Sequence, residues 1–158
     1  RHTLLIATND STRAYHAHEL MHALSIGLWG RATEPADWIQ EGLAVYADTP
    51  CAGNELYVIA AYHLHRGSLL PLDTLAAHFR ALPDMQAYMQ AGAVVNYIID
   101  RFGIIIFHRL WNEGWSGFEK ITGEPVDRFE AEYRALLLQR CQEEPNVDWE
   151  QLVRHGCG

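Results

Sequence analysis

Two histidines and a glutamate near the amino terminus have the spacing of a metal site. The run His-Glu-Leu-Met-His places His18 and His22 four residues apart. On a helix, residues with this spacing lie on the same face, so both imidazoles can bind one ion. Glu19 lies off that face but within reach of a water on the metal. Catalytic zinc usually has three protein ligands and a water, so a third ligand is needed.

Glu41 can supply that ligand, with 18 residues between it and His22. Two histidines and one glutamate are a known ligand set for catalytic zinc. Zinc lowers the pKa of its bound water, and Glu19 would be the general base that completes deprotonation. The pattern therefore predicts one zinc ion on His18, His22 and Glu41. The alternative is a chance match on the solvated face of an amphipathic helix.

The helices that must position these residues can also be predicted. Residues 13–29 have apolar cover at helical spacing, and Gly30 could end that helix. A second helix over 35–48 begins near Pro35, since proline suits a first helical turn. Gly42 inside this helix costs about 1 kcal/mol relative to alanine. We therefore expect another part of the chain to approach Gly42 closely.

The motif residues resemble those of the gluzincin metallopeptidases. HELMH, the gap of 18 residues and the run WIQEGLAVY at 38–46 are most similar to the peptidase MA-like group, which is related to aminopeptidase N and the glycyl aminopeptidases. Weaker similarity continues through segments 66–72, 88–103 and 123–138. The resemblance implies a zincin (thermolysin-like) catalytic domain, and it matches His18, His22 and Glu41 to zinc ligands and Glu19 to the general base.

Two further side chains are candidates for supporting roles. The resemblance implies that Tyr88 donates a hydrogen bond to the oxyanion, as a phenol can near neutral pH. The alternatives are an ordinary aromatic at a helix start, or Tyr97 in its place. Asp48, seven residues after Glu41, could accept a hydrogen bond from a ligand histidine and orient it. It could equally be a surface charge at a helix end.

The sequence departs from the family's pattern in the region before the zinc helix. No segment like the GAMEN motif, which binds the free amino terminus in aminopeptidase N relatives, is visible. Residues 3–7 read as the only candidate edge strand of the family's sheet. We therefore expect one mainly α (α+β) domain over 1–158, with a short edge strand, a truncated upstream sheet and a helical subdomain over 54–158.

Within that helical part, hydrophobic spacing, glycines and prolines predict the individual elements. Phe129 and Tyr133, with Leu136 or Leu137, form the expected buried stripe of the helix that Pro125 opens. Helices are expected over 56–64, 73–81, 87–101, 104–111, from 125 onward and over 147–154, with a turn at 114–117.

Composition excludes several function classes. The 158 residues are 49% hydrophobic and 20% charged, which is typical of one folded domain rather than of a disordered chain. A net charge of -8 argues against a nucleic-acid-binding surface. No uninterrupted apolar run is long enough for a membrane-spanning segment.

The three cysteines leave the redox state open. Cys51, Cys141 and Cys157 allow one disulfide and a free thiol, with Cys141 and Cys157 as the local candidates, or three thiols. The first possibility slightly favours an extracytoplasmic location.

The function expected from these residues is a zinc-dependent peptidase that hydrolyses peptide bonds with a metal-bound water activated by Glu19. Its partner would be a peptide or protein substrate. The alternative is a zinc-binding, catalytically weak or inactive module of the same fold in a larger protein.

Overall fold

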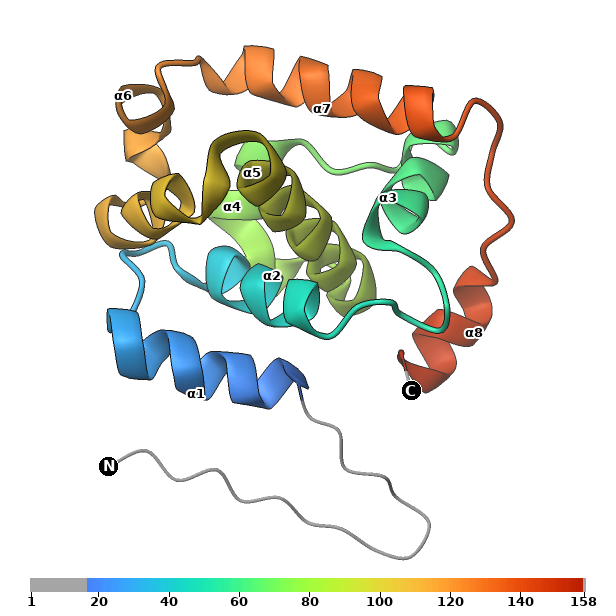
Figure 1. The fold of residues 1–158 in the computed structure, drawn as a ribbon. Helices are drawn as coiled ribbons and strands as arrows, with labels where there is room; N and C mark the ends of the chain where they lie inside the picture. Colours follow the sequence, from blue (N-terminus) through green and yellow to red (C-terminus); the bar gives the residue numbers. More distant parts are fainter. Residues whose placement is uncertain (1–16, 158) are drawn as a thin grey trace, which may run out of the picture.

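The computed structural model describes residues 17–157 and contains helices joined by short connections (Figure 1). Within this range there is no β-strand, only an isolated bridge between Cys51 and Asn54. The predicted mainly α class is therefore confirmed. The candidate edge strand at 3–7 and the first residues of the predicted helix 13–29 lie outside the described residues.

The order of the helices along the chain follows the predicted one closely. They are α1 (Ala17–Trp29), α2 (Asp37–Ala47), α3 (Leu56–His65), α4 (Leu72–His78), α5 (Asp84–Glu113), α6 (Phe118–Thr122), α7 (Val126–Arg140) and α8 (Trp149–His155), with 3₁₀ turns at Phe79–Ala81 and Trp115–Gly117. The second helix begins at Asp37 rather than near Pro35, and α6 was not predicted.

The centre of the fold is the crossing of α2 and α5, which pack against each other more extensively than any other pair of helices. Glycines make the crossing close. A Cβ atom on Gly42 would lie 2.7 Å from the carbonyl oxygen of Ala91, and one on Gly92 would lie 2.6 Å from Cγ1 of Val45. The expected close approach to Gly42 is confirmed, and the glycines fix how α2 lies on α5.

Helix α5 is interrupted at Gly103, which has φ 81° and ψ 166°. Positive φ is the region that favours glycine, so the predicted helices over 87–101 and 104–111 are the two halves of α5. By length and composition alone α5 could cross a membrane. Its first half also supplies the centre of the core, including the fully buried Ala91, Val94 and Ile98, and core helices have the same composition.

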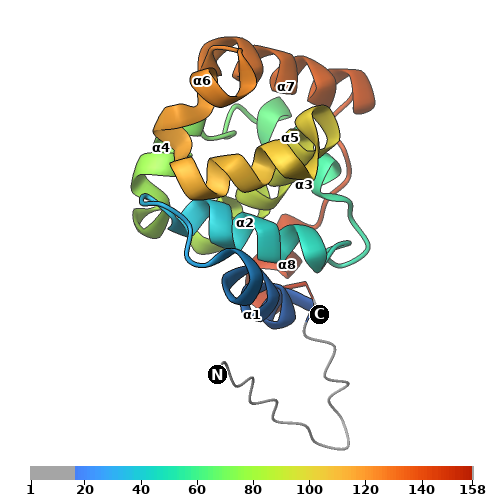
Figure 2. The ribbon, with the colours of Figure 1, turned by 60° about the vertical axis from the view of Figure 1, so that its left-hand side comes forward.

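Helix α7 closes the other side of α5 (Figures 1 and 2). Phe129, Tyr133 and Leu137 are fully buried, whereas Leu136 is only partly buried, which confirms the predicted stripe and selects Leu137. Burying such side chains stabilises a fold by roughly 1.5–3 kcal/mol each. Arg101 Nη2 also donates to both carboxylate oxygens of the buried Glu124, at 2.8 and 3.0 Å.

A disulfide joins Cys51, in the turn after α2, to Cys157, after α8. Cys141 is a free thiol, so the local pairing of Cys141 with Cys157 was wrong. The reason is tertiary: α8 returns the chain to the connection between α2 and α3, where the Ala52 N–H donates to the Cys157 carbonyl at 3.2 Å. Cys51 is 106 residues away from its partner in sequence, so spacing could not identify it.

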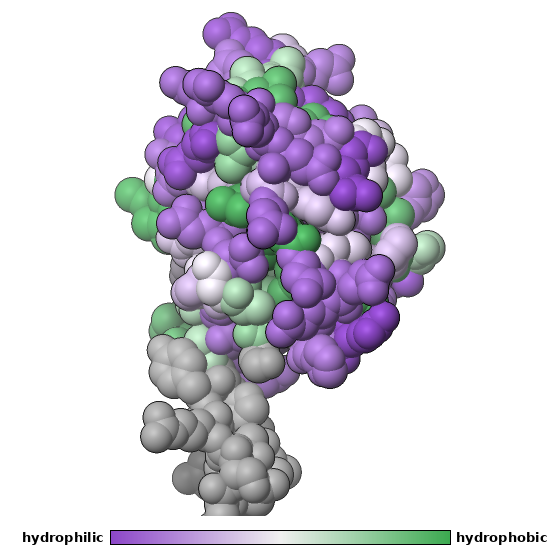
Figure 3. Space-filling model, turned by 90° about the vertical axis from the view of Figure 1, so that its right-hand side faces the viewer, coloured by the Kyte–Doolittle hydropathy of each residue, from purple (hydrophilic) through white to green (hydrophobic). Residues whose placement is uncertain are grey.

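The surface on the side of α3 and α8 is mainly hydrophilic, with hydrophobic groups in small, separate patches (Figure 3). Such patches are normal for a folded domain. By contrast, α1 exposes Leu20, Leu24 and Leu28 on the face turned away from α2, as far as the described residues show.

Candidate metal centre

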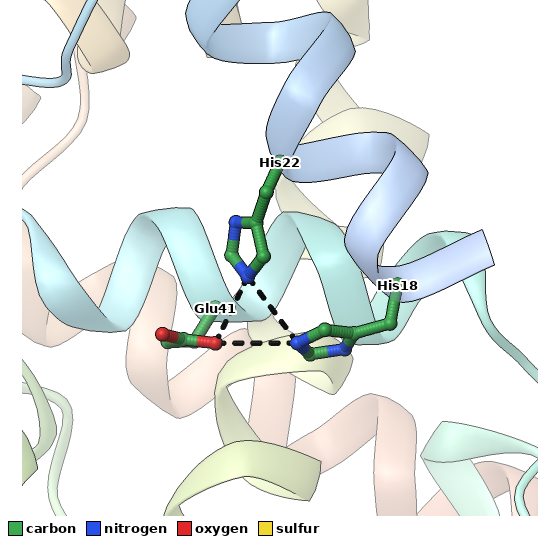
Figure 4. Close-up of side chains that lie close together, drawn as sticks. All are labelled: His18, His22 and Glu41. Carbon is green, nitrogen blue, oxygen red and sulfur yellow. Dashed lines mark hydrogen bonds and ion pairs between the residues drawn. The ribbon is translucent and has the colours of Figure 1, made fainter. Parts of the chain in front are cut away.

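His18 and His22 from α1 and Glu41 from α2 point toward a common centre (Figure 4). Glu41 Oε2 lies 3.3 Å from His18 Nε2 and 3.2 Å from His22 Nε2. The two Nε2 atoms are 3.2 Å apart. The three side chains are 14–25% exposed, so they are shielded but remain accessible from solvent. The predicted triad is close enough to hold a metal ion.

The local structure explains this convergence. The four-residue spacing puts both imidazoles on one face of α1, with their rings edge to face and centroids 4.9 Å apart. The connection from α1 to α2 is tied to the end of α5. Trp111 Nε1 donates to the Gly30 carbonyl at 3.0 Å, and the Thr33 N–H donates to the Trp111 carbonyl at 2.9 Å. These bonds hold α1 across α2 opposite Glu41.

The electrostatics suit a metal ligand set. Burial alone would raise the pKa of Glu41, but hydrogen bonds with His18 and His22 outweigh it and hold that pKa well below its usual range. The hydrogen bond with Glu41 raises the pKa of His18, against the opposing effect of burial. Because a metal binds the neutral imidazole, metal binding at this site is expected to release protons.

Glu19 lies on the exposed side of α1, one residue after His18. It makes no side-chain hydrogen bond or ion pair with another described residue. Its negative charge contributes to the raised pKa of His18, after Glu41. Glu19 is not one of the residues whose ligand atoms converge. Its carboxylate is exposed and can contact water beside the triad.

Tyr88 lies beside the triad, where its ring is stacked on that of His18 with centroids 6.5 Å apart and planes at 22°. Its hydroxyl accepts a hydrogen bond from Arg80 Nη1 at 3.1 Å. Burial, followed by the charge of Glu41, raises the pKa of Tyr88, so the phenol keeps its proton. Tyr97, the alternative, lies elsewhere: it accepts from Arg101 and packs on Phe129.

Asp48 shares a cavity with His18, but no hydrogen bond joins its carboxylate to His18 or His22. Its charge contributes to the raised pKa of His18 after those of Glu41 and Glu19. The structure therefore places Asp48 near the triad without the direct contact that orientation of a ligand histidine would require.

Arg80 is a neighbour of the triad that sequence reasoning missed. It lies in the 3₁₀ turn before α5 and donates to Asp37 at 2.9 Å, to Glu41 Oε1 at 3.3 Å and to the Tyr88 hydroxyl at 3.1 Å. It thereby links the glutamate that could bind a metal to the tyrosine beside it. No spacing rule connects these positions, because the contact depends on the crossing of α2 and α5.

A cavity of about 360 Å³ opens beside His18. It is bounded by α1, the end of α2, the start of α5 and the disulfide. Its lining residues are His18, Val45, Asp48, Thr49, Cys51, Arg80, Asp84, Met85, Tyr88, Met89 and Cys157. The triad thus lies at the edge of a space that is large enough for part of a small ligand.

Comparison of this chain with models of protein families, with curated proteins and with solved structures found no match.

Proposed function

We propose that this chain is a zinc-dependent peptidase of the gluzincin type, which hydrolyses peptide bonds with a water activated by Glu19. The observation that carries the proposal is the convergence of His18, His22 and Glu41 from two helices on one point. The chance alternative requires only a solvated helix face, and such a face would not need Glu41 from another helix within 3.3 Å of both imidazoles.

The size of the triangle supports zinc as the ion. Zinc binds histidine nitrogen and carboxylate oxygen at about 2.0–2.2 Å in tetrahedral geometry, so the ligand atoms are separated by about 3.3 Å. The three separations here are 3.2, 3.2 and 3.3 Å. One face of a zinc tetrahedron therefore fits the ligand atoms with little movement. Calcium and magnesium prefer sites made of oxygen ligands.

Zinc at this position would lower the pKa of a bound water and polarise the carbonyl of the substrate. Glu19, exposed beside His18, is the group that accepts the proton of the attacking water. Tyr88 already accepts a hydrogen bond from Arg80, so its own O–H can donate to the oxygen that becomes negative in the transition state. Arg80 holds this hydroxyl and Glu41 Oε1 in place.

The metal site can be tested separately from the chemistry. We expect elemental analysis of the purified protein to find about one zinc per chain, and the His22→Ala variant to lose it. His155→Ala, which removes an exposed histidine of α8, is the matched control and should keep the zinc. Zinc retained in His22→Ala would contradict the ligand assignment.

The general base is tested by Glu19→Gln, which should retain zinc and lose hydrolysis of peptides with free and blocked amino termini. Glu41→Ala should weaken zinc binding much more than Glu19→Gln does. Hydrolysis retained in Glu19→Gln would refute the role of Glu19. Zinc bound tightly by a wild-type protein that hydrolyses no peptide would instead favour the alternative, a zinc-binding module without activity.

A further inference from the structure

The cavity beside the triad is placed where a substrate side chain would lie. One edge of it is formed by the stacked rings of His18 and Tyr88, and both residues belong to the proposed reaction centre. A peptide bound with its scissile carbonyl at the triad would have an adjacent side chain within reach of this opening. At about 360 Å³, the cavity is at the small end of ligand pockets, which span roughly 300–1,000 Å³.

The inner part of the cavity is apolar and rich in sulfur. Val45 and Met89 are buried, and the disulfide of Cys51 and Cys157 forms part of the wall. Cys157 Sγ lies 4.0 Å from Met89 Sδ. Met85, partly buried in the first turn of α5, completes this surface. Methionine side chains are flexible and polarisable, so they adapt to apolar groups of different shape.

The charged residues at the cavity are compatible with binding of an uncharged side chain. Arg80 is already paired with Asp37 and Glu41, neither of which lines the cavity. Asp48 and Asp84 make no ion pair with another described residue. Two carboxylates near the opening repel an acidic side chain, so glutamate is rejected, and the apolar inner lining favours an apolar side chain.

We propose that this cavity is the specificity subsite of the peptidase and that it receives an apolar side chain of medium size, such as leucine or methionine. The inference rests on the proposed function, because it assumes a metal ion on His18, His22 and Glu41. The methionines of α5 and the disulfide select the side chain, while the triad holds the backbone of the substrate next to it.

The test uses amino-acid hydroxamates, which bind zinc and differ only in the side chain. Binding to the zinc-loaded full chain is measured by calorimetry for the glycine, leucine, methionine, lysine and glutamate compounds. We expect the leucine and methionine compounds to bind roughly tenfold to a hundredfold more tightly than the glycine compound. The glutamate compound should bind no more tightly than the glycine compound.

Met85→Trp fills the cavity and should reduce the preference for leucine over glycine to less than about threefold, which is below the roughly tenfold that a single methylene in a pocket contributes. Its zinc content should not change, because Met85 does not belong to the triad. Val153→Trp adds the same side chain on the exposed face of α8 and is the matched control. Met85→Ala enlarges the cavity and should raise the affinity for phenylalanine hydroxamate relative to the leucine compound.

Equal binding of all the compounds to zinc-loaded protein, or a preference for lysine over leucine, would overturn the subsite and leave the zinc site intact. The same loss of preference in Val153→Trp as in Met85→Trp would also overturn it, because the effect would then not be local. A protein that binds no zinc would refute the proposed function and this subsite with it.

Discussion

The crossing of α2 and α5 allows a sharp prediction about Gly42→Ala. The added methyl group would lie 2.7 Å from the Ala91 carbonyl oxygen and 2.8 Å from Val95 Cγ2. The first of these atoms is backbone inside a helix, so the helices must separate. Overpacking of a core costs about 1–3 kcal/mol, and backbone clashes favour the upper end. The better helix propensity of alanine returns about 1 kcal/mol. We therefore expect a net loss of about 2 kcal/mol in the free energy of unfolding.

The matched control is Gly27→Ala in α1. No atom of the described residues lies within 4 Å of a Cβ at this position. The same substitution should therefore stabilise the protein by up to about 1 kcal/mol through helix propensity alone. The free energies of unfolding of the two variants should differ by about 3 kcal/mol, because the added methyl group clashes at position 42 and meets no neighbour at position 27.

The assay is urea unfolding of the metal-free protein, followed by a zinc titration of each variant. Gly42→Ala should also bind zinc about tenfold more weakly, because Glu41 is the adjacent residue and moves with α2, and misplaced metal sites lose roughly 10–100-fold in affinity. A Gly42→Ala variant as stable as Gly27→Ala would refute the close packing. A destabilised variant with unchanged zinc affinity would show that the crossing does not position Glu41.

Three further predictions follow from other residues. Burial lowers the pKa of His63 to about 4. Between about pH 6.5 and 4 the unfolded state therefore binds a proton that the folded state does not. The free energy of unfolding in urea, relative to that of His63→Asn, should fall by up to about 3 kcal/mol as the pH falls through this range. Tyr133→Phe removes a fully buried hydroxyl that has no hydrogen-bond partner among residues 17–157. Thermal unfolding should therefore show unchanged or slightly higher stability, and a loss above about 1 kcal/mol would contradict this. Arg80→Gln should lower kcat roughly tenfold to a hundredfold, with Arg80→Lys intermediate. Urea unfolding should change by less than about 1 kcal/mol, because the Arg80 side chain itself is exposed.

The parts of the site that the sequence predicts depend on local spacing. The four-residue spacing of His18 and His22 places both rings on one face of a helix whatever the rest of the chain does. Gly42 also carried a usable signal, because a glycine inside a helix indicates a close neighbour. Glu41 was identified by its spacing from the histidines in a known motif, and the structure brings it to them.

The parts that the sequence did not predict depend on the tertiary path. Arg80 reaches Glu41 and Tyr88 only because α5 crosses α2, and no periodicity encodes that meeting. The partner of Cys157 was misassigned because α8 carries it to the distant Cys51 rather than to Cys141. The candidate strand at 3–7 remains a prediction, since it lies outside the described residues.

The disulfide gives the chain the topology of a ring with a linear arm. Residues 51–157 form the ring, which carries Arg80 and Tyr88, whereas His18, His22 and Glu41 all lie on the arm. A single cut in the exposed connection 66–68 would leave every residue of the site in one covalent piece under oxidising conditions, because the disulfide joins the two fragments. A cut in the exposed connection 30–35 would release both histidines with α1. Nicks at these two places are chemically alike, and the topology makes only the second one able to dismantle the site.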